Sequence, residues 1–224
     1  MSSYFSWNEQ TITDFSEANV NAQYNQGYVF TRKGKGVMNQ TRSLRIDLSK
    51  FELSSENRRV LKKNEQLKMN NEQLPYSTYD WKIGKLAHDF YETKFGKGTF
   101  SANKVKELMT DPEKSNFNRV FVYSIEEKKI GYSIIHETPQ LIHYSYPFYE
   151  LTDLQTYKLT NLGLGMMLRA ILYAKEQCKK YIYLGSAQRP GDTYKLQFTG
   201  LEWFDGNEWQ NDLDKLKLEL DKKI

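Results

Sequence analysis

The sequence predicts an α+β fold, with a small N-terminal subdomain and a larger domain whose mixed, twisted sheet is flanked by helices. Two helical patterns precede a run of consecutive strand patterns, and a long helix followed by one more strand comes after that run. No internal repeat is visible. The 224 residues can bury a sizeable core, and the 27% of charged and 14% of aromatic residues are typical of a folded chain.

The N-terminal subdomain is predicted over residues 1–72. Residues 32–36 combine glycine with lysine and arginine, a composition that favours a hairpin or a mobile loop. Ile46, Leu48 and Phe51 follow the apolar spacing of a strand, and the serines at 54–55 can cap the helix that comes next. The polar residues 64–75 are expected to link the two parts, or in their first residues to continue that helix.

The larger domain is predicted over residues 76–224. Strand patterns cover 120–124, 129–136, 141–149 and 181–185, with a hairpin at 125–128. Helical patterns cover 80–95, 101–109, 162–178 and 211–224. In the last helix Leu213, Leu216 and Leu220 share one side.

A cluster of basic residues is the first candidate binding surface. Their spacing gathers four positive charges on one side of the helix that follows residue 55: Arg58, Arg59, Lys62 and Lys63. Such a face suits a phosphate-rich partner, although a charge run taken alone is more often a solvated surface. The formal net charge of +4 is compatible with binding a nucleic acid and does not argue for it.

Cysteine content and hydropathy exclude several classes. Cys178 is the single cysteine, so neither an intramolecular disulfide nor a thiol-built metal cluster is expected. No apolar run reaches the length of a membrane span, and the N-terminus lacks the apolar core of a signal peptide. We therefore expect a cytoplasmic location and no membrane partner.

The segment from Arg45 to Asn64 resembles an ordered pattern, R-I-x-V-x-x-F-x-P-S-R-S-Q-R-R-V-L-K-R-N, of the aminoacyl-tRNA–protein transferases. These are the arginyl- and leucyl-transferases of the N-end rule pathway. Leu53 stands in place of the proline, and the family's upstream cysteine cluster has no counterpart here. The resemblance implies the GNAT-like fold, typified by the GCN5-related N-acetyltransferases, and it continues discontinuously to about residue 209.

The resemblance also implies site residues. Tyr149 aligns with the end of a family strand beside which the acceptor amine enters. Glu150 stands where the family has Asp, and it would hold or deprotonate that amine. Tyr183, Tyr194 and Lys195 match a later motif, in which Lys195 would read an acidic acceptor side chain or an RNA phosphate. Tyr149 and Tyr194 are counted with Glu150 as catalytic, and Arg45 and Tyr183 with Lys195 as substrate-binding.

Gly163 and Gly165 open the long helix, where glycines and free backbone amides allow a ligand to approach closely. A tight strand-to-helix turn explains them about as well. In acetyltransferases a similar loop holds acetyl-coenzyme A, but Thr160 stands where those enzymes have Gln or Arg.

The resemblance implies an aminoacyltransferase that moves an amino acid, of the Arg or Leu class, from charged tRNA to the N-terminal α-amine of a protein or peptide, one with an acidic first residue. It implies no cofactor and no metal. Two alternatives stay open: an acyl-coenzyme A-dependent N-acyltransferase using acetyl-coenzyme A, and a non-catalytic module that binds tRNA or acidic N-termini.

Overall fold

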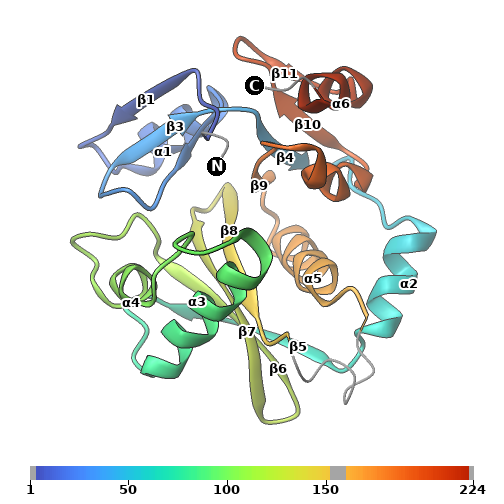
Figure 1. Ribbon diagram of the computed structural model, residues 1–224. Coiled ribbons are helices and arrows are strands. Elements are labelled where there is room, and N and C mark those ends of the chain that lie inside the picture. The colour runs from blue at the N-terminus through green and yellow to red at the C-terminus, as the bar shows by residue number, and fades with distance from the viewer. Residues whose placement is uncertain (1–3, 152–159, 222–224) are drawn as a thin grey trace. The chain divides into compact units, whose positions relative to one another are not determined.

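A computed structural model describes residues 4–151 and 160–221 (Figure 1). The chain divides into two compact units, each assembled from separate segments. The first unit contains residues 1–54, 138–143 and 174–224, and the second contains residues 55–137 and 144–173. Strand β8 (Leu141–Tyr149) and helix α5 (Leu162–Glu176) contribute residues to both units. These units do not test the subdomain boundary expected at residues 72–76, which stays a prediction.

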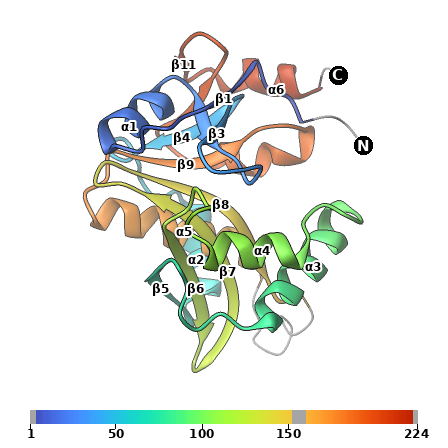
Figure 2. The same cartoon turned by 90° about the vertical axis from the view of Figure 1, so that its left-hand side faces the viewer.

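The first unit holds two groups of strands. Its elements are β1 (Asn8–Thr11), α1 (Glu17–Asn25), β2 (Tyr28–Phe30), β3 (Val37–Gln40), β4 (Ser43–Asp47), β9 (Tyr181–Ser186), the 3-10 helix η1 (Pro190–Gln197), β10 (Leu201–Phe204), β11 (Trp209–Gln210) and α6 (Leu213–Asp221). Strands β1, β3 and β2 form an antiparallel sheet in that order (Figure 2). Strands β11, β10, β4 and β9 pair antiparallel, and the start of β8 pairs parallel with β9.

The hairpin expected at residues 32–36 is confirmed as the connection between β2 and β3. Gly36 has a φ of 78°, and a Cβ atom there would lie 2.1 Å from the Ile12 carbonyl oxygen. Because only glycine avoids that clash, this position needs glycine both for its backbone conformation and for space.

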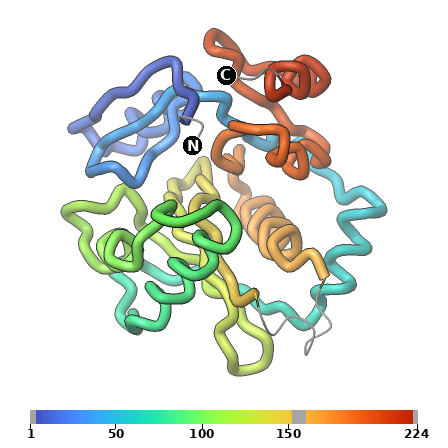
Figure 3. The backbone as a smooth tube through the Cα atoms, viewed as in Figure 1, coloured from blue at the N-terminus to red at the C-terminus, as the bar shows by residue number. Residues whose placement is uncertain are grey.

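The second unit contains a meander and the helices around it. Its elements are α2 (Ser55–Lys63), β5 (Leu67–Gln73), α3 (Trp81–Phe95), α4 (Ala102–Thr110), β6 (Arg119–Ile125) and β7 (Lys128–Glu137), with most of β8 and α5. Strands β5, β6 and β7 pair antiparallel, and β8 follows β7 in the strand order. Helices α3 and α4 pack against each other (Figure 3).

Local capping explains where two of these helices begin. The Asp80 side chain accepts a hydrogen bond of 2.8 Å from the Lys82 amide at the start of α3. Ser101 accepts one of 3.2 Å from the Lys104 amide at the start of α4. Each cap satisfies a backbone donor that the first helical turn leaves without a partner. Both helices predicted in this region are therefore confirmed to within a residue at their starts.

The predicted α+β class, with a mixed sheet flanked by helices, is confirmed. One expectation is wrong: residues 64–75 are not a polar link, because they contain β5, which pairs with β6 from Leu67 to Gln73. The predicted C-terminal helix is α6, in which Leu216 and Leu220 are buried as expected. The end of that prediction, residues 222–224, lies outside the described residues.

Candidate functional site

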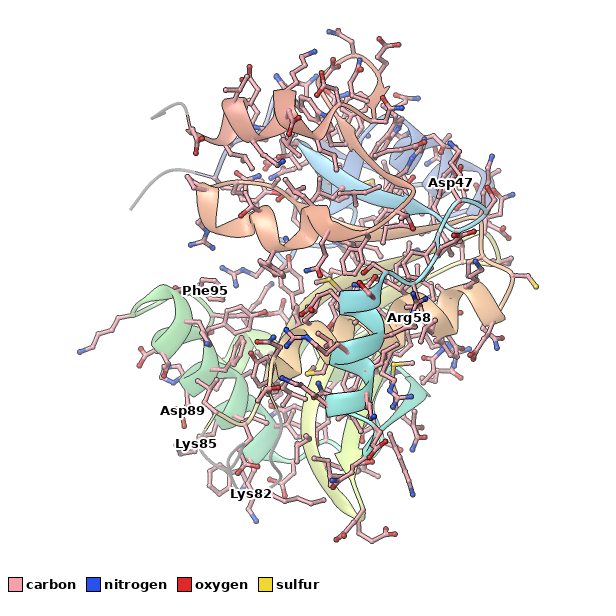
Figure 4. The ribbon with its side chains drawn as sticks, turned by 90° about the vertical axis from the view of Figure 1, so that its right-hand side faces the viewer. Asp47, Arg58, Lys82, Lys85, Asp89 and Phe95 are labelled. Atoms are coloured by element: carbon pink, nitrogen blue, oxygen red, sulfur yellow. The ribbon has the colours of Figure 1, made fainter. Side chains whose placement is uncertain are left out.

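Helix α2 carries the predicted basic surface. Asn57 and Val60 are buried on one side of the helix. The basic face, which we define as Arg58, Arg59, Lys62 and Lys63, is exposed (Figure 4, where Arg58 is labelled). Because residues 58, 59, 62 and 63 span an arc of about 140° at 100° per residue, the four charges share one surface of the second unit.

Part of that positive charge is compensated within the helix. Arg59 donates two hydrogen bonds to Glu56, with Nε–Oε2 and Nη2–Oε1 distances of 2.7 and 2.8 Å. The hydrogen bond from Arg59, opposed by slight desolvation, holds the pKa of Glu56 below its ordinary value. Glu56 is thus ionised at neutral pH, and a phosphate that binds Arg59 competes with its carboxylate.

Asn64 ties the end of α2 to the start of α5. Its side-chain amide donates to the Val60 carbonyl at 2.9 Å and to the Thr160 carbonyl at 3.0 Å. From α5, Arg169 donates in return to the carbonyls of Asn64 and Glu65, both at 3.2 Å. The three hydrogen bonds that involve Thr160 and Arg169 fix the end of the basic helix against the helix whose N-terminus holds the predicted glycine motif.

The two glycines of that motif make room for side chains of the protein itself. A Cβ atom on Gly165 would lie 2.8 Å from Asn64 Cγ, and one on Gly163 would lie 3.0 Å from the Tyr149 hydroxyl. Their small size is therefore explained by internal packing. A role for Gly163 and Gly165 in binding a ligand stays a prediction.

Tyr149 and Glu150 lie at the end of β8 in the second unit. The Tyr149 ring packs against Phe90 with a centroid distance of 4.7 Å. Burial raises the pKa of Tyr149, and a hydrogen bond with the backbone of Gly163 opposes that shift. The phenol is therefore protonated at neutral pH and can donate a hydrogen bond.

Glu150 forms an ion pair with Lys128, with an Oε2–Nζ distance of 2.8 Å. An ammonium group is the type of partner predicted for this carboxylate. In the structure that ammonium is the Lys128 side chain and not the amine of an acceptor. Its side chain is 25% exposed, so Glu150 is within reach of solvent. Its role toward an acceptor amine stays a prediction.

In the first unit, Arg45 is enclosed by other side chains. Its guanidinium lies 4.0 Å from the Tyr181 ring centroid and 3.8 Å from that of Trp209. Arg45 Nε donates to Glu202 at 2.8 Å, and Glu202 lies directly opposite Arg45 on β10. The Arg45 side chain is 9% exposed. This arrangement indicates that Arg45 stabilises the sheet.

Tyr183, directly opposite Arg45 on β9, is fully buried. Its hydroxyl makes no hydrogen bond with another atom of the described residues. Burial raises the pKa of Tyr183 to about 12, and the nearby Arg45 guanidinium opposes the shift. The residue fills the core of the first unit, and its predicted contact with substrate stays a prediction.

Replacing Tyr183 with phenylalanine is expected to change the pH dependence of stability. Without the substitution, Tyr183 has its ordinary pKa of about 10 in the unfolded state and a pKa of about 12 in the folded state. The contribution of the protonated Tyr183 to the free energy of unfolding is therefore fully present below pH 10, and it is lost as the pH rises toward 12. Denaturant unfolding measures the free energy of unfolding of the native protein and of Tyr183→Phe. The difference between the two should change by about 2–3 kcal/mol from pH 8 to pH 12. A constant difference would contradict this role for burial.

Tyr194 and Lys195 lie in η1 and differ in exposure. Tyr194 is 48% exposed, whereas Lys195 is half-buried. The Lys195 ammonium donates to the Ser186 carbonyl at 3.0 Å, at the end of β9. Burial lowers the pKa of Lys195, and Asp192 opposes the shift. A half-buried ammonium with a lowered pKa gains from an incoming anion, which fits the predicted recognition of a carboxylate or phosphate.

The predicted site residues fall into two groups, one in each compact unit. The second unit contains the basic face, Tyr149, Glu150 and the two glycines, and the first contains Arg45, Tyr183, Tyr194 and Lys195. Glu202 and Trp209, which enclose Arg45, were missed by sequence reasoning. The alternating Leu201 and Trp203 could have indicated β10 and, with it, the strand that carries Glu202.

Residues 4–151 and 160–221 offer neither a metal-binding cluster nor a membrane-spanning helix. These residues contain no group of three or more His, Cys, Asp or Glu side chains arranged to hold a metal ion. No helix in the same ranges combines the length and the apolar character that crossing a membrane requires.

Comparison with solved structures finds distant likenesses. The chain resembles the L-PGS structure from Bacillus licheniformis at 12% identity and a TM-score of 0.48, covering 93% of this chain and 71% of that one. A GCN5-related glucosamine N-acetyltransferase region of a fungal multi-domain enzyme gives 10% identity and a TM-score of 0.45, covering 87% and 22%. Likenesses this distant carry no weight for the function of the chain.

Comparison of sequences finds a nearer relative. No protein-family model matches the chain. It is 28% identical over 173 residues to an aspartate/glutamate leucyltransferase from Ruegeria pomeroyi. The match includes 75% of this chain and 61% of that protein, so the chain spans less than two thirds of the relative's length. This similarity confirms the resemblance to the aminoacyl-tRNA–protein transferases that the segment from Arg45 to Asn64 indicates.

Proposed function

We propose that the chain transfers a leucyl group from charged tRNA to the α-amine of a protein or peptide that begins with Asp or Glu. The observation that carries this proposal is the similarity to an aspartate/glutamate leucyltransferase over 75% of the chain. The exposed basic face on α2 supports the tRNA part of the proposal, because phosphate contacts supply most of the affinity for a nucleic acid.

The chemistry needs alignment more than activation, because the aminoacyl ester is already reactive. The α-amine nitrogen attacks the ester carbonyl carbon, the new C–N bond forms, and the ester C–O bond to the tRNA breaks. The amine loses a proton, and the 3′-oxygen of the tRNA gains one. The enzyme must therefore hold two reactants, accept a proton and stabilise the oxyanion.

Each unit, taken by itself, holds residues that suit some of these tasks. Glu150 would accept the proton of the amine after exchanging Lys128 for the substrate. Tyr149, kept protonated by burial, would donate a hydrogen bond to the developing oxyanion. Lys195 would pair with the acidic side chain of the acceptor, because an incoming carboxylate offsets the cost of its partial burial. Tyr194 is exposed enough to contact substrate, and the buried Arg45 and Tyr183 would hold the sheet of the first unit in place.

A mass-spectrometric assay tests the proposal. The purified chain is mixed with leucyl-tRNA and with peptides that differ only in their first residue. Parallel arms replace the donor with arginyl-tRNA or with acetyl-coenzyme A. We expect a mass gain of one leucine residue on the peptides that begin with Asp or Glu, and none on those that begin with Asn or Gln.

The other arms decide between the remaining readings. An arginine gain would keep the reaction and change the donor. An acetyl gain would establish the coenzyme A-dependent reaction, which the packing around Gly163 and Gly165 does not favour. Binding of charged tRNA with no transfer to any peptide would contradict the enzymatic proposal in favour of a binding module.

A further inference from the structure

A groove in the first unit gathers three lysines that the proposed site does not use. It has a volume of about 400 Å³. It is lined by Asp47, Leu48 and Ser49, from the end of β4 and the turn that follows, and by Lys175, Lys179 and Lys180. We call this set of six residues the lysine groove; Figure 4 labels Asp47 at the end of β4.

The end of helix α5 places the three lysines together. Cys178 has a φ of 53°, in the left-handed region, and its amide donates to the Lys175 carbonyl at 3.0 Å. The Lys179 amide donates back to the Ala174 carbonyl at 3.0 Å, and the Lys180 amide donates to the Gln140 carbonyl at 2.8 Å. This reversal closes the helix in the manner of a Schellman turn, so that residues before and after it line the same groove.

The ammonium groups of the three lysines keep the capacity to bind an anion. Lys175 donates to the Phe51 carbonyl, and Lys179 donates to the Thr138 carbonyl at 2.7 Å. An ammonium has three donors, so a single backbone contact does not exhaust it. Lys180 lies over the Tyr181 ring, 5.2 Å from its centroid, and is exposed.

The Asp47 carboxylate in the groove already has partners close to it in the chain. Asp47 accepts hydrogen bonds from the Ser49 hydroxyl at 2.6 Å and from the Ser49 amide at 3.1 Å, and it pairs with Lys50 at 3.1 Å. Burial raises the pKa of Asp47, but these partners outweigh it and hold the pKa below the ordinary value. The charge of Asp47 is therefore compensated by Lys50, and the three lysines leave the groove positive.

We propose that the lysine groove binds phosphates of an RNA strand and, on the basis of the proposed function, gives the tRNA substrate a second contact in addition to the basic face of α2. Three flexible point charges without an arginine suit successive backbone phosphates better than one planar carboxylate. The exposure of Lys175 and Lys180 favours a polymer lying along the groove over a small enclosed phosphate ligand.

The test measures binding of uncharged tRNA by the full chain over a range of salt concentrations. Lys175→Gln/Lys179→Gln/Lys180→Gln is expected to lower the affinity about tenfold or more and to reduce the salt slope by roughly 2–3. The matched control, Lys94→Gln/Lys97→Gln/Lys106→Gln, removes the same charge from exposed positions of the second unit and should change both quantities much less. Equal effects of the two triple variants would overturn the inference.

Two milder variants keep the test decisive if the triple variant folds poorly, since Lys175 and Lys179 also hold backbone carbonyls. Lys180→Gln alone should reduce the salt slope by about 1. Asp47→Asn, which can keep the contact with Ser49, should raise the affinity roughly twofold to fivefold. Unchanged binding in both would overturn the inference.

This result is separable from that of the transfer assay. Loss of RNA affinity in the lysine variants, in a chain that transfers nothing, would support the groove and contradict the enzymatic proposal. If the native chain transfers leucine and its lysine variants bind tRNA normally, the enzymatic proposal is supported and the RNA contact in the groove is contradicted.

Discussion

Replacing Arg45 with alanine is expected to lower the free energy of unfolding by about 2–4 kcal/mol. The change leaves Glu202, whose side chain is 17% exposed, without its nearest cation. It also empties the space between the rings of Tyr181 and Trp209. Lys50, 3.4 Å from the other oxygen of Glu202, limits the loss. Urea unfolding followed by circular dichroism measures it.

A matched control separates the cost of disrupting a buried ion pair from the cost of losing an exposed one. Lys33 pairs with Glu9 in the same unit, but their side chains are 61% and 46% exposed. Lys33→Ala should therefore cost less than about 1 kcal/mol. If Arg45→Ala left stability unchanged and abolished transfer, Arg45 would be the substrate-binding residue that its motif suggests, and the structural role argued here would be wrong.

Elements with strong local signals could be predicted from the sequence, and those that depend on distant partners could not. β8 has the predicted limits because alternating apolar side chains mark it, and α3 begins beside the capping residue Asp80. β5 was missed because just Leu67 is fully buried among largely exposed polar residues. It pairs with β6 alone and stands last in the strand order, where an edge strand can stay polar.

The candidate site divides in the same way. Helical periodicity is enough to predict which side chains α2 exposes, because its buried Asn57 and Val60 lie opposite the charges. No sequence pattern distinguishes buried Tyr183 from exposed Tyr194. The contact between Asn64 and Gly165 joins residues a hundred positions apart, so it depends on the fold and not on a local motif. Family resemblance located these residues, but their environments required the structure.

Removing the charge of the basic face is expected to have the largest effect on RNA binding. Arg58→Gln/Arg59→Gln/Lys62→Gln/Lys63→Gln should reduce the slope of log affinity against log salt by roughly 3–4 and lower tRNA affinity about a hundredfold or more. Glutamine is a good helix former, and buried Asn57, Val60 and Asn64 are untouched, so α2 should persist. Fluorescence titrations at several salt concentrations, with circular dichroism as the check on folding, measure both quantities.

Single variants within α2 test the assignment more closely, because the four charges are not equivalent. Arg59 shares its charge with Glu56 through two hydrogen bonds, so a phosphate gains less from it. Arg59→Gln should therefore weaken binding less than Lys62→Gln, and Glu56→Gln should strengthen it by releasing Arg59. The same salt slope in the quadruple variant and the native protein would show that tRNA does not bind this face. Equal losses from Arg59→Gln and Lys62→Gln, with no gain from Glu56→Gln, would instead show that the ion pair does not limit the contact.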